Sequence, residues 1–141
     1  MSISGEEAMK ICGKVLFAVS MSLLFAVSAA NAQEKKLVPK FDAANQTTIK
    51  GIIDQVSDYE CPISGTMGSH LSVKNADETV EVHLAAAKFL KEYGIVFAKG
   101  DPVQVTGTKA TFDGKPALLA RQVIVGNRTY SFRDDKGIPL W

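Results

Sequence analysis

Apolar residues change their spacing partway along this chain, and the change sets the order of its secondary structure. They alternate with polar residues over 79–84, as expected for a strand with one buried face. The next apolar residues recur at i, i+3, i+4 and i+7, which predicts a short amphipathic helix. This stripe consists of Ala86, Phe89, Leu90 and Tyr93. Gly94 follows it, as a helix-ending glycine should, and Lys91 is expected to face solvent.

The other strands are predicted from alternation and from β-branched residues. They cover residues 47–56, 70–74, 103–108 and 117–125, with a short added strand at 128–132. Residues 57–69 are expected to form a long loop, and the polar residues 75–78 a hairpin turn. Gly51 inside the first strand indicates a bend of the kind that a strand curling around a small barrel needs.

The resulting order is β-β-β-α-β-β within about a hundred residues, which is the order of the OB-fold. We therefore expect an all-β fold with one short helix: a five-stranded OB-fold barrel with a C-terminal β extension. The helix would close the bottom of the barrel. An open sandwich is the alternative.

The first 32 residues are typical of an export signal rather than of the fold. Lys10 and Lys14 precede an apolar run over 15–27, and Ala30-Asn31-Ala32 supplies the small residues of a cleavage site. An uncleaved membrane anchor is less favoured, because the run is shorter than the roughly 20 residues of a membrane span. The predicted organisation is a signal peptide at 1–32, a linker at 33–45 and an OB-fold domain at 46–141. The mature protein is expected in the periplasm or outside the cell, not embedded in a membrane.

Composition narrows the classes of partner. The chain has 16 Lys and Arg against 15 Asp and Glu, a net charge of +1, which argues against a protein that mainly grips nucleic acid phosphates. Of its two cysteines only Cys61 follows the leader, so the mature chain has no internal disulfide. A single thiol in an oxidising compartment requires burial, a metal or a partner.

The stretch from Thr47 to Ile124 resembles the exported bacterial OB-fold (BOF-like) family of small, periplasmic, stress-associated proteins. The ending from Ser131 to Trp141 is similar to the tails of secreted relatives. The resemblance implies an OB-fold and an exported location. It supplies no catalytic residues.

The register of the predicted hairpin at 70–84 places several polar side chains together in a candidate ligand-binding site. Directly opposed residues of an antiparallel hairpin have a constant index sum, and the turn at 75–78 makes that sum 153. His70 then opposes His83, Ser72 opposes Glu81, and Lys74 opposes Thr79. Their side chains should share the outer, open face of the second and third strands, flanked by the loops at 57–69 and 110–114. That face is the usual ligand surface of an OB-fold. The predicted ligand-binding residues are His70, Ser72, Lys74, Glu81, His83 and Tyr59.

The histidine pair also suggests a metal site. Two imidazoles with a nearby thiolate or thioether suit copper or zinc. The candidate ligands are His70, His83, Cys61 and Met67. The alternative is that the histidines are ordinary cross-strand neighbours and that Cys61 is buried in its loop.

Other functions have weaker support. A nucleophilic catalytic site could be formed by Cys61, His70 and Glu81 as nucleophile, base and orienting acid. Any small domain offers such a set, however. Stacking aromatics and basic residues would serve nucleic acid or oligosaccharide binding by the OB-fold face. The candidates for it are Tyr59, Phe112, Tyr130, Lys50, Lys74 and Arg121. We expect a non-enzymatic binding module for an unknown small ligand or partner protein, with no cofactor required unless copper or zinc is bound.

Overall fold

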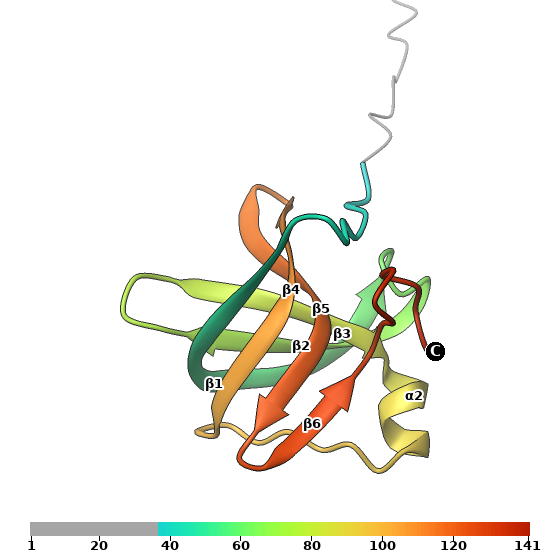
Figure 1. Cartoon of the computed structure of the whole chain (residues 1–141). Helices are drawn as coiled ribbons and strands as arrows, with labels where there is room; N and C mark the ends of the chain where they lie inside the picture. The colour runs from blue at the N-terminus through green and yellow to red at the C-terminus, as the bar shows by residue number, and fades with distance from the viewer. Residues whose placement is uncertain (1–36) are drawn as a thin grey trace, which may run out of the picture. The chain divides into compact units, whose positions relative to one another are not determined.

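The computed structural model describes residues 37–141; the predicted signal peptide lies outside this range. The described part is an all-β domain with one short helix, as predicted (Figure 1). Its elements are β1 (Gln46–Cys61), β2 (Thr66–Lys74), β3 (Thr79–Ala86), α2 (Ala87–Glu92), β4 (Pro102–Phe112), β5 (Lys115–Val125) and β6 (Arg128–Ser131). No helix within 37–141 is long and apolar enough to cross a membrane.

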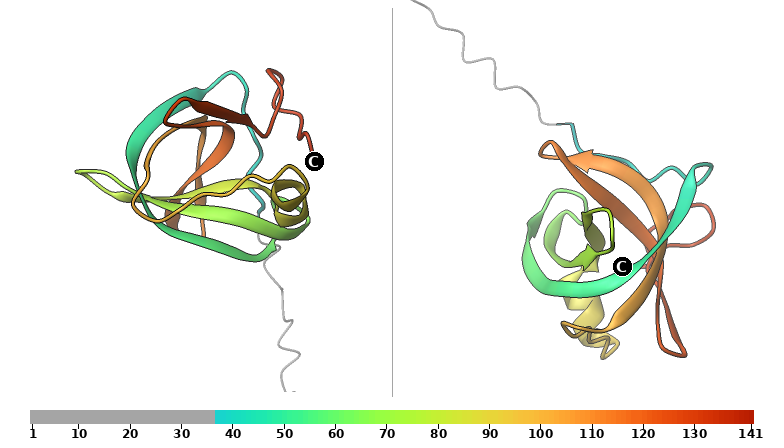
Figure 2. Two further views of the ribbon diagram at one scale, coloured as in Figure 1. Left: turned by 90° about the horizontal axis from the view of Figure 1, so that it is seen from below. Right: turned by 90° about the vertical axis from the view of Figure 1, so that its left-hand side faces the viewer.

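The six strands form one sheet in the order β3-β2-β1-β4-β5-β6. A parallel pairing between β3 and β5 joins the two sides of this sheet and closes five of its strands into a ring, while the other neighbours are antiparallel (Figure 2). This strand order is that of the predicted OB-fold, with β6 as the predicted extension. The core inside the ring includes Ile53, Leu71, Val82, Val105 and Leu118.

Strand β1 bends as it passes from one neighbour to the other. Its first half pairs with β4 and its second half with β2, and the change occurs at Ile52, next to Gly51. A Cβ atom at Gly51 would lie 2.5 Å from the carbonyl oxygen of Lys74, so only glycine permits this approach. A bulge follows between Ile53 and Gln55. The predicted bend is confirmed.

The predicted loop at 57–69 is wrong. The chain stays extended to Cys61, turns through residues 62–65, and starts β2 at Thr66. Ser57 to Glu60 contain a single apolar residue, Tyr59, so the sequence shows no strand period here. Pairing with β2, including Ser57 with His70 and Tyr59 with Gly68, holds the segment as a strand instead.

Helix α2 follows β3 directly and buries Leu90, while Lys91 is exposed. Gly94 has the positive φ of a helix-ending residue, as predicted. The assignment of Tyr93 to the buried stripe is wrong, since its side chain is 66% exposed. The helix ends at Glu92, so Tyr93 leaves the helical path and contacts only the ring of Phe89 among the aromatic residues described.

The segments on either side of the strands pack onto the domain. In the part of the predicted linker that the structure describes, the backbone N–H of Asp42 donates to Oγ1 of Thr108, and that hydroxyl donates to the carbonyl of Asp42. After β6, residues 132–141 form the tail. There the Arg133 guanidinium lies 5.2 Å from the ring of Phe41 and 4.8 Å from the ring of Trp141.

Candidate metal centre

Three neighbouring strands bring Cys61, His70 and His83 together. Cys61 is the last residue of β1, His70 lies in β2 and His83 in β3. The predicted register is confirmed: His70 pairs with His83, Ser72 with Glu81 and Lys74 with Thr79. The turn favours this register, because Oδ1 of Asn75 accepts hydrogen bonds from the backbone N–H groups of Asp77 and Glu78. Cys61 reaches the pair because β1 runs the full length of β2.

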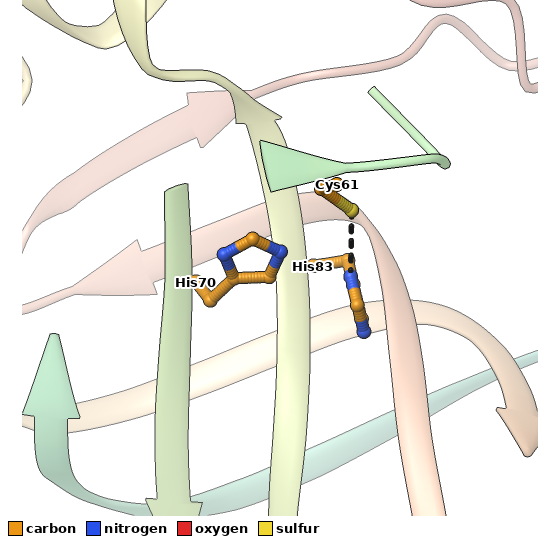
Figure 3. A group of neighbouring side chains, drawn as sticks. All are labelled: Cys61, His70 and His83. Atoms are coloured by element: carbon orange, nitrogen blue, oxygen red, sulfur yellow. Dashed lines mark hydrogen bonds between the residues drawn. The ribbon is translucent and has the colours of Figure 1, made fainter. Parts of the chain in front are cut away.

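The three side chains converge on one point (Figure 3). One possible ligand atom from each residue can be chosen so that all three lie within 4.8 Å of one another. The Sγ atom of Cys61 and Nδ1 of His83 are 3.4 Å apart, and the two imidazole centroids are 4.6 Å apart with the rings almost perpendicular. Among residues 37–141 this group contains no carboxylate.

The prediction of an open face at this position is wrong. Only 1% of His70 and 4% of His83 is exposed, and Cys61 is buried as well. Tyr59 stacks on the His70 ring with centroids 3.7 Å apart and planes 6° apart. Phe112 packs edge-on against His83 at 5.2 Å. Both aromatic residues lie on strand ends that extend beyond their predicted limits, so the outer face of the hairpin is covered here.

The imidazoles are not fully hydrogen-bonded. Within the described chain, the buried Nδ1 of His70 and Nε2 of His83 have no hydrogen-bond partner. A cavity of about 10 Å³ lies against Cys61, His70, His83 and Trp141. A single water needs roughly 10–15 Å³, so the cavity has room for about one atom-sized occupant. Buried polar atoms without partners are uncommon and call for an explanation.

Burial lowers the pKa of both histidines to about 4. For His70 the backbone of Ser57 and the charge of Asp58 act in the opposite direction, but less strongly. For His83 the charge of His70 lowers the pKa further. Desolvation has a larger effect on the pKa of His83 than repulsion from His70 does. Both rings are therefore neutral at pH 7, the form in which imidazole binds metals.

The spacing of the donor atoms suits a metal ion. Ligands at about 2.0 Å for nitrogen and 2.3 Å for sulfur, arranged tetrahedrally, are separated by about 3.3–3.5 Å. The Cys61–His83 pair already has this separation, and the His70 nitrogen needs to move by little more than an ångström. Cys61, His70 and His83 could therefore hold one ion, with the sulfur as thiolate and the imidazoles neutral.

The remaining predicted site residues lie elsewhere. Ser72 and Glu81 line a groove of about 360 Å³ that also contacts His70 and Lys115. Burial raises the pKa of Glu81, and the charge of Lys115 opposes that rise. Neither Lys74 nor His83 lines the groove. Met67 is 45% exposed and borders a separate surface hollow beside Cys61, not the cavity of about 10 Å³.

The structure does not assemble the other candidate sites. The sulfur of Cys61 faces His83, and Glu81 is outside the group, so the Cys61–His70–Glu81 triple is not formed. The proposed stacking aromatics contact other rings of the domain: Tyr59 lies on His70, Phe112 on His83 and Tyr130 on Phe97.

Trp141 is the residue that sequence reasoning missed at the site. It has no predicted role beyond the end of the tail, yet it lines the cavity. The tail carries no hydrophobic period that would have placed Trp141 there. In the structure, the buried guanidinium of Arg133 packs against the Trp141 indole. A cation in the tail that could stack on an aromatic ring is the one sequence feature that bears on this position.

Comparison with known proteins corrects the resemblance drawn from the sequence. Residues 45–130 match the model of the MamS/MamX magnetosome protein family. The chain is also 29% identical over 133 residues to a protein described as "Magnetosome protein MamS" from Magnetospirillum gryphiswaldense, covering 92% of this chain and 70% of that protein. The assignment to the exported BOF-like family is therefore wrong; it rested on strand order and tail, features that many OB-folds share. The chain belongs to the MamS/MamX magnetosome protein family.

Proposed function

We propose that this protein is a metal-binding member of its family, with one ion held by Cys61, His70 and His83. A single observation carries the proposal: three buried donor side chains meet with their ligand atoms within 4.8 Å of one another. The Cys61 sulfur already lies 3.4 Å from Nδ1 of His83, which further supports a ligand shared by these side chains. Thiolate and imidazole together favour copper or zinc. Family membership supports a magnetosome role for this protein.

Calorimetry with copper and zinc tests the proposal on the wild type and on His70→Ala, His83→Ala and the double variant. Each single change should abolish the same binding event, and the double variant should lose no more than either single one. Lys74→Ala is the matched control, because Lys74 lies on the same strand as His70 but is exposed. Wild-type affinity no greater than that of the double variant would refute the metal site.

The groove over β2 and β3 supports a second candidate function, the binding of a small polar ligand. It is lined by hydroxyl, amide, carboxyl and ammonium groups, including Ser57, Ser72, Gln55, Glu81 and Lys115. A thermal-shift screen of short oligosaccharides and polar metabolites tests it. A hit should be lost in Glu81→Gln and Lys115→Ala but kept in Cys61→Ser, since Cys61 is outside the groove. A hit that depends on Cys61 would assign binding to the metal centre instead.

Export remains part of the proposal. The basic residues, apolar run and Ala30-Asn31-Ala32 support cleavage after Ala32. Intact-mass measurement of protein from the periplasmic fraction should give a chain beginning at Gln33. A mass that retains residues 1–32 would contradict this.

A further inference from the structure

We infer that the ion held by Cys61, His70 and His83 is monovalent copper rather than a divalent metal. The inference rests on the proposed metal-binding function and deepens it. Three properties of the site carry it: the number of donors, their total charge, and the space around them.

The donor count favours an ion that is satisfied by three ligands. Among the described residues no fourth His, Cys, Asp or Glu joins the group. Zinc is almost always four-coordinate in proteins, so it would need a water or hydroxide at the fourth position. Thiolate donors bind Cu(I) and zinc alike, but Cu(I) is stable with only three soft or borderline ligands.

The available space disfavours a fourth ligand. The cavity is about 10 Å³, close to the volume that one water needs by itself. An ion accompanied by a water would have to displace the packed neighbours, which include Leu84 and Trp141. An ion with only protein ligands fits without that displacement.

The charge balance points the same way. The Cys61 thiol loses its proton to solvent when its sulfur binds the ion, while the two imidazoles stay neutral. One thiolate and Cu⁺ then sum to zero, whereas one thiolate and a divalent ion leave a buried charge of +1. An uncompensated buried charge is costly, and no carboxylate of the described chain is in the group to offset it.

Competition titrations distinguish the two ions. Wild-type protein is titrated anaerobically with Cu(I) against bicinchoninate, and separately with Zn(II) against a chromogenic zinc chelator. We expect one Cu(I) per chain, bound about 100-fold or more tightly than Zn(II). Cys61→Ser, which replaces the soft sulfur by a hard oxygen, should weaken Cu(I) binding by at least about 100-fold. Met67→Leu is the control and should leave both affinities unchanged, since Met67 is outside the cavity.

X-ray absorption of the copper-loaded wild type provides a measurement that depends on no variant. It should show one sulfur and two nitrogen neighbours with no oxygen at bonding distance. Zn(II) bound as tightly as Cu(I), or a fourth light ligand on copper, would overturn the assignment to Cu(I) while leaving a metal site. Failure of both ions to bind more tightly to wild type than to His70→Ala/His83→Ala would instead remove the proposed function itself.

Discussion

His70 and His83 have mainly aromatic neighbours, and the one carboxylate that acts on them, that of Asp58, affects the His70 pKa less than burial does. Their rings contact Tyr59, Phe112 and each other, and burial is the main reason that the pKa of each is lowered to about 4. A neutral imidazole in an apolar setting loses little on binding a metal, because it has no proton to release and no ion pair to break. The same setting makes the protonated ring costly.

The metal-free domain should therefore lose stability as the pH falls. Because the folded-state pKa is below the unfolded value of 6.5, the unfolded chain takes up protons first, between about pH 6.5 and 4. We expect the free energy of unfolding to fall by on the order of 2–4 kcal/mol between pH 7 and pH 5. Urea unfolding at several pH values measures this. The double variant His70→Gln/His83→Gln should show a much flatter profile, and equally steep profiles would rule out the histidines as the cause.

At the scale of elements, the packing of helix α2 against the core can be tested by substitution. Leu90 is 6% exposed and belongs to the core cluster, while its neighbour Lys91 is exposed. Leu90→Ala should cost about 2–5 kcal/mol of unfolding free energy through lost burial and the cavity left behind. Lys91→Ala should change it by no more than about 0.5 kcal/mol. Similar losses for the two variants in urea unfolding would mean that the buried face of the helix is assigned wrongly.

A second prediction concerns whether Arg133 holds the tail residue Trp141 in place. Trp141 is the only tryptophan of the chain, so its fluorescence reports on the tail and the cavity wall. Arg133→Met removes the guanidinium that lies 4.8 Å from the indole, and we expect emission to move to longer wavelength as water reaches the ring. Lys136→Met removes the same charge from an exposed position of the tail and should leave the emission unchanged. Equal spectra from the two variants would show that Arg133 does not hold Trp141.

The β2–β3 hairpin shows which parts of the site could be predicted. Its polar turn and its alternation determine the register, so the pairing of His70 with His83 followed from the sequence. The burial of this pair could not be predicted in the same way, because it depends on side chains from other strands. Tyr59 and Phe112 reach the histidines from strand ends that lie beyond the predicted limits of β1 and β4, so the prediction did not place them there. The position of Cys61 depended likewise on the unpredicted length of β1.

At the scale of the whole molecule, the ring and the site share their strands. The fold class was predictable because two features together are compatible with few topologies. These are the switch from strand to helix spacing of apolar residues after the third strand, and the bend in the first strand. The three donors come from β1, β2 and β3, which are consecutive in the chain and adjacent in the sheet. A bound ion would therefore tie the end of β1 to β3 across β2. The site exists only when these strands are paired, so metal binding and folding are thermodynamically linked.

Loading with Cu(I) should consequently stabilise the entire domain against unfolding. At a free ion concentration 100 times the Kd, mass action adds about 2.7 kcal/mol to the free energy of unfolding. For a domain of this size that corresponds to a rise in Tm of about 10 °C or more. Anaerobic thermal unfolding with bicinchoninate-buffered Cu(I) measures the rise, and Met67→Leu should match the wild type. Cys61→Ser should show little rise at the same free Cu(I), because the thiolate is gone. A Tm of the wild type that stays constant at saturating Cu(I) would show that the ion binds the unfolded chain equally well, which a site assembled from three paired strands does not allow.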